Sequence, residues 1–163
     1  MDEQLLELTE LQQVLEDYAK EAEEMYKYQI ALGRKNASRR LTDTVKSNVV
    51  VGDQSYEVTL TLQHYWKYIE HGRPAGKKFP PMKVLLDWIS VKPVIPRPDE
   101  DGNIPSPQTL AFLIGRKIHL EGIDPHPALK ATQEELEMIY HERLSAALGH
   151  DVANYIRKLI APK

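Results

Sequence analysis

Apolar residues near the start of the chain recur at spacings of three and four, which is the period of one face of an α-helix. The seam consists of Leu5, Leu8, Leu11, Leu15, Tyr18, Ala22 and Met25. No glycine or proline interrupts it before Gly33, and the opposite face is rich in glutamate. We predict a helix over residues 1–32, long enough to project beyond the compact body of a small domain. Its acidic face fits either ordinary solvated surface or a partner-binding surface.

The pattern changes from helical spacing to alternation in the next part of the chain. Residues 36–47 are polar and basic with apolar side chains at spacing four, which predicts a short helix. Residues 49–51 are β-branched, residues 52–54 have turn chemistry, and apolar and polar side chains alternate over residues 56–62. These features predict an antiparallel hairpin with one wet face.

Aromatic side chains are dense over residues 64–71, where the pattern fits either a third strand or a short helix packed on the sheet. Gly72 is expected to end this segment. Residues 73–81 combine glycine, proline and lysine, which predicts an irregular basic loop. A short helix is expected to follow, with an apolar face made of Val84, Leu85, Trp88 and Ile89.

A proline-rich segment separates this helix from the next. Residues 91–107 hold several prolines, which cannot donate ladder hydrogen bonds, so we predict an exposed loop or a loose hairpin. Ser106 and Pro107 form a helix start, and Gly122 is placed to end that helix. Its inner face is expected to consist of Leu110, Leu113, Ile114 and Ile118.

The last helix is expected to follow an extended segment over residues 123–129, because residues that precede proline avoid the helical conformation. Thr132 and Glu135 have capping-box spacing, which predicts that the helix begins there. Its apolar face keeps its phase past Gly149, which favours one long helix. The apolar positions are Leu136, Ile139, Tyr140, Leu144, Ala147, Leu148, Val152, Tyr155, Ile156 and Leu159.

These elements predict an α+β fold in which helices flank a small, mainly antiparallel sheet, with long N-terminal and C-terminal helices. The 163 residues suit a single domain over 1–163. The apolar fraction of 42% is enough for a packed core. No basic start followed by an apolar stretch marks a secretory signal, and no apolar run approaches the ~20 residues of a membrane span.

Charge is unevenly spread along a chain whose net charge is −3. Residues 1–27 are mostly acidic, whereas residues 34–46 and 67–83 are basic. Strong duplex binding usually leaves a basic footprint over the whole domain, and this composition lacks one. The basic, aromatic segment 64–83 could still stack bases and meet phosphates. We favour the alternative that Tyr65, Trp66, Tyr68 and Phe79 are core or interface anchors.

Candidate chemistry is sparse. The absence of cysteine excludes disulfides, a thiolate nucleophile and Cys-based zinc sites. His141-Glu142 begins like a zincin helix, but position 145 is serine. Residues 99–110 lack the glycine and glutamate of a calcium loop, and neither a phosphate-binding loop nor a nucleophile elbow is present. We therefore expect no catalytic residue, metal or cofactor. A small hydrolase stays as a weaker alternative, because catalytic sites are assembled in space.

Two short motifs resemble the tail-completion, or head–tail joining, family of tailed bacteriophages. The first is Tyr65-Trp66-Lys67-Tyr68-Ile69-Glu70-His71-Gly72, and the second is Asp124-Pro125-His126-Pro127-Ala128-Leu129. His71 and Arg73 stand where an aromatic and a small hydroxyl residue are usual. The resemblance covers most of the chain from about residue 42. The matching residues are Tyr65, Tyr68, Glu70, Gly72, Pro125, Pro127, Ala128 and Leu129.

This resemblance implies a non-enzymatic virion protein that forms a homo-oligomeric ring in the neck or tail, between portal or adaptor and tail proteins. DNA would pass through the ring with at most non-specific contact, and assembly would occur in the host cytoplasm without a membrane. The alternative is a nucleic-acid-binding regulator that uses segment 64–83. We expect the acidic first helix of one subunit to meet a basic face of its neighbour. The expected interface residues are Glu16, Glu23, Glu24, Arg39, Arg40, Tyr68, Arg73, Lys77, Lys78 and Phe79.

Overall fold

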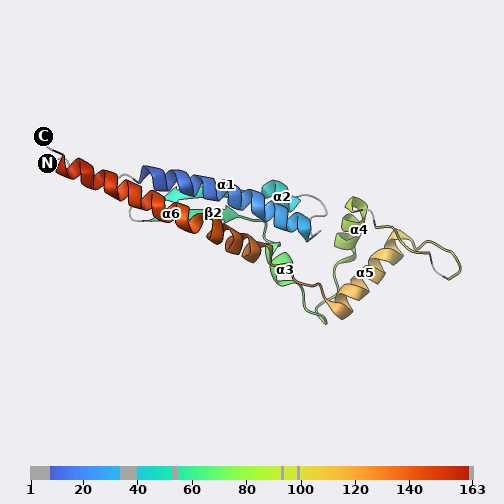
Figure 1. Ribbon diagram of the computed structural model, residues 1–163. Helices are drawn as coiled ribbons and strands as arrows, with labels where there is room; N and C mark the ends of the chain where they lie inside the picture. The colour runs from blue at the N-terminus through green and yellow to red at the C-terminus, as the bar shows by residue number, and fades with distance from the viewer. Residues whose placement is uncertain (1–7, 34–39, 53–54, 93, 99, 162–163) are drawn as a thin grey trace. The chain divides into compact units, whose positions relative to one another are not determined.

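The computed structural model describes residues 8–161 except 34–39, 53–54, 93 and 99 (Figure 1). It combines six helices with a two-stranded antiparallel sheet in this described part, which confirms the predicted α+β class. The elements are α1 (Thr9–Leu32), α2 (Arg40–Thr44), β1 (Lys46–Val51), β2 (Tyr56–Thr61), α3 (Trp66–His71), α4 (Met82–Val91), α5 (Pro107–Glu121) and α6 (Ala128–Ile160). None of the described helices is both long and apolar enough to cross a membrane.

The chain forms two compact units, each assembled from separate stretches of sequence. Unit 1 comprises Met1–Gln29, Val45–Leu62 and Leu129–Lys163. Unit 2 comprises Ile30–Thr44 and Gln63–Ala128. Unit 1 therefore holds most of the two long helices and the hairpin, and unit 2 holds α3, α4, α5 and the loops between them.

The start of α1 is fixed by a side chain from the other end of the chain. The predicted seam begins at Leu5, but residues 1–7 lie outside the described residues, and the described helix begins at Thr9. Asp151 of α6 accepts hydrogen bonds from the backbone N–H groups of Glu10 (3.1 Å) and Leu11 (2.8 Å). The first N–H groups of a helix have no partner within it, and an acidic side chain there satisfies them. Asp151 is only 5% exposed, so it acts as the cap of α1 from within the core.

The core of unit 1 lies where α1 packs against α6. The predicted seam of α1 is only partly correct, because Ala22 is buried but the other buried residues of α1 in this unit, Ala19 and Tyr26, were not part of it. Ala22, Leu136 and Tyr140 are buried together, and the rings of Tyr18 and Tyr140 meet edge to face at 5.1 Å. The Tyr140 hydroxyl donates to Glu21 Oε2 at 2.6 Å. Further apolar side chains pack around this cluster, namely Val14, Met25 and Leu144.

Burial, followed by the hydrogen bond to Glu21 and its negative charge, raises the pKa of Tyr140 from 10.0 to about 12. The unfolded chain therefore ionises this phenol first, and we expect the free energy of unfolding to fall from about pH 10 to pH 12. Tyr140→Phe removes the ionisable group. Urea unfolding should show the native chain losing its advantage over Tyr140→Phe as the pH rises through this window. A difference that stays constant from pH 9 to about 11.5 would contradict the assignment.

The hairpin of unit 1 follows the alternation in the sequence. β1 pairs with β2 from Lys46↔Thr61 to Val51↔Tyr56, and the apolar residues of β2 are half-buried while their polar neighbours are exposed. The Ser47 N–H donates to Glu23 of α1 at 3.0 Å. The predicted helix over 36–47 is wrong at its end, because Lys46 and Ser47 already belong to β1; only Arg40–Thr44 is helical in its described part.

α6 is one continuous helix through Gly149, as predicted, but its predicted start is wrong. The helix begins at Ala128, directly after Pro127, so the capping-box pair lies inside it. Thr132 is buried rather than placed at a helix end. The prolines of the preceding segment prevent helix up to this point, and Ala128 is the first residue free of that constraint.

α4 and α5 pack against each other in unit 2. The Ser106 hydroxyl accepts from the Thr109 N–H at 3.1 Å, which confirms the predicted helix start. The predicted inner faces are partly wrong, because Leu113 and Val84 are exposed. The buried positions of α5 are instead Ala111 and Gly115. These small residues let neighbouring groups approach closely: a Cβ on Gly115 would lie 2.4 Å from the Phe79 ring.

Candidate functional site

The two sequence motifs, far apart in the chain, are hydrogen-bonded to each other in unit 2. Within the segment 64–71, residues Trp66–His71 form the helix α3 and not a third strand, and Gly72 ends it as predicted. The backbones of Arg73 and Ile123 exchange two hydrogen bonds of 2.8 Å, and the His126 N–H donates to the Ile69 carbonyl at 2.8 Å. We call this contact the motif junction. Its members are Ile69, Gly72, Arg73, Gly122, Ile123 and His126.

The junction requires glycine at two positions. Gly72 has φ 67° and ψ −160°, and Gly122 has φ 82° and ψ −159°, a backbone region that is essentially restricted to glycine. A Cβ on Gly72 would lie 2.3 Å from the Ile123 carbonyl oxygen, and one on Gly122 would lie 2.3 Å from that of Arg73. Each glycine therefore adopts a backbone conformation that other residues avoid. Its missing side chain also leaves space for the backbone of the opposite segment.

The remaining motif residues divide between the inside and the surface. Glu70 and Ala128 are buried, and Tyr65 and Leu129 are half-buried. Tyr68, Pro125 and Pro127 are exposed. The motifs thus act mainly as structural elements of the junction, and Tyr68 is exposed whereas Tyr65 and Trp66 are half-buried.

The basic loop, residues 73–81, is held by hydrogen bonds of its backbone and carries exposed lysines. The Gly76 N–H donates to the His119 carbonyl at 2.7 Å, and His119 Nδ1 lies 2.7 Å from the Lys77 carbonyl oxygen. The Arg73 guanidinium donates to the Lys78 carbonyl. These bonds bind the loop to the end of α5, so the exposed Lys77 and Lys78 side chains project from a defined position.

Phe79, in the last part of the basic loop, packs inside unit 2. Its ring stacks on Phe112 of α5 with centroids 5.9 Å apart and contacts His119. Phe79 is half-buried, whereas Phe112 is exposed. Phe79 thus takes part in packing, which is one of the two roles expected for it, and Phe112 is the more accessible ring of the stacked pair.

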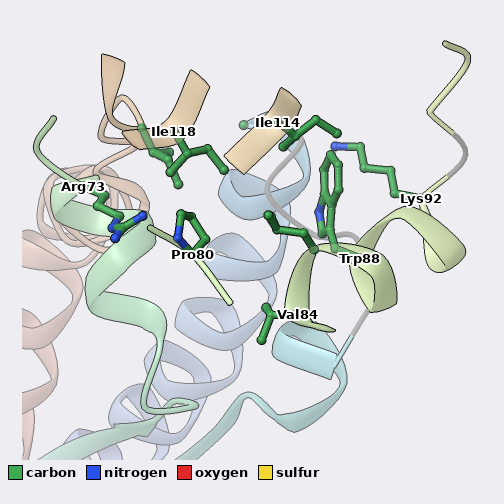
Figure 2. Close-up of a pocket in the computed structure, with 10 residues that line it drawn as sticks. Arg73, Pro80, Val84, Trp88, Lys92, Ile114 and Ile118 are labelled. Carbon is green, nitrogen blue, oxygen red and sulfur yellow. The ribbon is translucent and has the colours of Figure 1, made fainter. Parts of the chain in front are cut away.

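An open apolar cleft of about 580 Å³ lies beside the junction, between α4 and α5 (Figure 2). Figure 2 shows Trp88, Ile114 and Ile118 around it, with Arg73 at one end and Lys92 at the other. The Lys92 ammonium lies 5.5 Å from the centre of the Trp88 ring, a cation–π contact. This cleft could not be predicted from the sequence, because its lining residues come from separate segments of the chain and periodicity describes each segment by itself. The lining residues that complete it are Gly33, Pro80, Val84, Leu85 and Ile123.

The three glutamates of α1 that were predicted to lie at a subunit interface differ in their exposure and in the contacts that they already make. Glu23 contacts Lys27 at 2.7 Å and accepts from Ser47, and these bonds hold the pKa of its carboxyl below the usual value. Glu24 also pairs with Lys27, at 3.0 Å, but its side chain is 75% exposed. Glu16 is half-buried and accepts from Gln12 at 3.2 Å. Arg39 and the side chain of Arg40 lie outside the described residues.

Charge separates strongly between the two units. Unit 1 contains 16 Asp and Glu against 8 Lys and Arg, and unit 2 contains 8 Asp and Glu against 13 Lys and Arg. The net charges are −8 and +5, which together give the −3 of the chain. A small total charge therefore conceals one acidic and one basic body in the same molecule.

Within the described residues, no group of three or more His, Asp or Glu side chains is placed to hold a metal ion. Comparisons of the chain with models of protein families, with curated proteins and with solved structures find no match.

Proposed function

We propose that this protein is a structural subunit of a tailed bacteriophage that assembles into a closed ring at the head–tail junction. The observation that carries this proposal is the charge separation between unit 1 and unit 2. A molecule with one acidic and one basic body can pair head to tail with a copy of itself, and head-to-tail contacts generate rings when the rotation closes. The resemblance of the two motifs to tail-completion proteins points in the same direction.

The charged side chains suggest which surfaces meet. The acidic face of α1 in one copy would approach the basic loop of the next, with Glu16 and Glu24 opposite Lys77 and Lys78. Glu23 is a poorer candidate because it is already bound by Lys27 and Ser47. Charges of this kind steer association and fix its register more than they add affinity. The subunit performs no reaction in this proposal; it places a DNA-conducting ring between portal or adaptor and tail proteins.

Mass photometry over a concentration series, followed by negative-stain imaging, tests this proposal directly. We expect a single closed species of several subunits, and its formation should weaken as salt is raised because exposed charges are screened. Particles that grow without a defined size would contradict closure. A strict monomer, both alone and with purified portal or tail proteins, would contradict ring assembly.

Reversing the charge of the basic loop should weaken assembly. The variant Lys77→Glu/Lys78→Glu changes two exposed side chains. The hydrogen bonds from Arg73 and His119 use the backbone carbonyls of these lysines and not their side chains. We expect an increase of about tenfold in the concentration for half-assembly, equivalent to about 1.4 kcal/mol per interface. The matched control Arg116→Glu/Lys117→Glu makes the same change of charge on α5. Equal effects of the two variants would show that net charge, and not this loop, governs assembly.

A second function is favoured by one observation, the Phe79–Phe112 stack beside Lys77 and Lys78. An exposed aromatic ring such as that of Phe112 near lysines is a surface on which nucleic acid bases and phosphates can bind. A regulator that binds nucleic acid would bind a duplex with an affinity that falls steeply with salt, as phosphate contacts release counterions. Phe112→Ala should weaken that binding and leave ring assembly unchanged, which separates the two functions.

A further inference from the structure

A cleft of about 550 Å³ lies within unit 1, where α1, the hairpin and α6 meet. Figure 1 shows α1, β2 and α6 side by side. Each of these elements contributes one tyrosine to the cleft: Tyr18 from α1, Tyr56 from β2 and Tyr140 from α6. We call it the tyrosine cleft. Its volume lies in the range of about 300–1,000 Å³ that is typical of small-molecule sites.

The spacing of residues along each element brings these side chains together. Leu15 and Tyr18 are three positions apart on α1 and therefore share a helix face. Tyr56 and Val58 are two positions apart on β2, so they lie on the same face of the hairpin. α6 supplies side chains at spacings of three and four, among them Glu137, Tyr140 and Leu144.

The three tyrosines are not equally able to contact a ligand. Tyr140 is only 1% exposed, its hydroxyl donates to Glu21, and the Arg143 guanidinium already lies 4.5 Å from the centre of its ring. Tyr18 and Tyr56 are half-buried, so each retains accessible surface where it lines the cleft. A ligand would therefore be recognised mainly by Tyr18 and Tyr56.

The charge around the tyrosine cleft is negative. Glu137 lines it and is exposed, and burial, followed by the negative charge of Glu137, raises the pKa of Tyr18. No lysine or arginine is among the described residues that line the cleft, and His141, which does line it, adds positive charge only when protonated. A neighbouring hollow on α6 shares Glu137 and adds Glu142. Unit 1 as a whole has a net charge of −8, so its field favours a cation over an anion.

We propose that the tyrosine cleft binds an organic cation, either a quaternary ammonium or a guanidinium group, with its charge beside Glu137 and its apolar body against Tyr18 and Tyr56. Aromatic rings attract cations through the negative charge of their faces, and groups of aromatic side chains are a known form of quaternary ammonium site. An inorganic divalent cation is a poorer occupant, because it requires several oxygen ligands in place of apolar walls. This inference does not depend on the proposed function.

Titration of the full chain, followed by NMR of isotope-labelled tyrosine rings, tests the proposal. The first probes are choline and its neutral isostere 3,3-dimethylbutanol, in which carbon replaces the charged nitrogen. We expect choline to shift the resonances of Tyr18 and Tyr56, assigned from Tyr→Phe variants, and to bind about tenfold more tightly than the alcohol. Tyr28 and Tyr68 are exposed and do not line the cleft, so they serve as internal controls. Equal shifts of all four rings would overturn the proposal.

A second pair of probes distinguishes the source of the cation. The amides of acetyl-arginine and acetyl-citrulline differ in the charge of the side chain. Tighter binding of choline than of the arginine probe would indicate a quaternary ammonium compound as the ligand. Tighter binding of the arginine probe would indicate a basic side chain of a partner protein. If neither cation binds better than its neutral isostere, the proposal is wrong.

Two sets of variants identify the groups that recognise the cation. Glu137→Gln should weaken binding of the preferred cation about fivefold and leave that of the neutral isostere unchanged. The matched control Glu142→Gln removes the same charge from α6 outside the tyrosine cleft. Equal effects of these two variants would show that the general field of unit 1 attracts the cation, and the cleft would then not be its site. Tyr56→Leu should weaken binding, whereas Tyr56→Phe, which retains the ring, should preserve it.

Discussion

Replacing Gly72 by alanine is expected to lower the free energy of unfolding by about 3 kcal/mol or more, and the same holds for Gly122. Two costs add at each position. The backbone conformation is strained for any residue with a Cβ, which costs about 1–3 kcal/mol. The new methyl group would also lie 2.3 Å from a carbonyl oxygen that is itself a member of the Arg73–Ile123 pair. The junction must therefore open to accommodate it.

The control for these variants is Gly76→Ala. Gly76 also has a positive φ of 75°, but a Cβ there would meet nothing within 4 Å. Gly76→Ala should therefore cost only the backbone strain, at the lower end of about 1–3 kcal/mol. Gly149→Ala should act in the opposite direction and stabilise α6 by about 0.5–1 kcal/mol, because alanine is a better helix former and the space is open.

Tryptophan fluorescence during urea unfolding is the measurement for this series. Both tryptophans, Trp66 and Trp88, belong to unit 2, so the signal reports the unit that contains the junction. If Gly72→Ala and Gly122→Ala shift the transition no further than Gly76→Ala, the close backbone approach at the junction is wrong.

The second large effect is expected at Asp151. Asp151→Ala removes the acceptor of two backbone N–H groups of α1 and leaves them without a partner in a partly buried place. A lost helix cap costs about 0.5–2 kcal/mol, and unsatisfied buried donors raise this figure. We expect a loss of about 2–3 kcal/mol in the free energy of unfolding.

Two further variants isolate the cause. Asp151→Asn retains one acceptor oxygen without the charge, so its effect should lie between those of the native chain and Asp151→Ala. His150→Ala removes the neighbouring exposed pair with Glu10 and should change stability by less than about 0.5 kcal/mol. Far-UV circular dichroism is the suitable probe, because α1 and α6 dominate the helical signal. An Asp151→Ala variant as stable as His150→Ala would refute the capping role.

The helices and strands could be predicted from the sequence where a single local pattern determined them, either the spacing of apolar residues or a residue typical of a helix start. The helix α1, the alternation of β2 and the Ser106 start of α5 are such cases, although the predicted seam of α1 missed the buried Ala19 and Tyr26. The start of α6 failed because a capping-box pattern is only a local preference, and the proline at 127 set the start instead. The inner face of α5 failed because close packing selected Ala111 and Gly115 over larger apolar residues.

The candidate surfaces could likewise be predicted only where the pattern is local. The basic loop was evident from composition, but the junction was not, because a hydrogen-bonded pair of distant segments leaves no local pattern. Asp151 could have been found. It follows Leu136, Tyr140, Leu144 and Ala147 at spacings of three and four, so an acidic residue occupies a position in phase with the core. A charge in that register requires a buried partner, and here the partner is the beginning of α1.

The cap on α1 also determines when unit 1 can be completed. Its donors lie at residues 10 and 11, and its acceptor lies 140 residues later in the chain. During synthesis, unit 2 is finished at residue 128, while α1 still lacks both its cap and the α6 surface that buries it. We infer that unit 2 is able to fold first and that α1 remains an uncapped, partly exposed amphipathic helix until α6 emerges. The order of the sequence thus leaves unit 1, the acidic unit, incomplete until the last helix of the chain has been made.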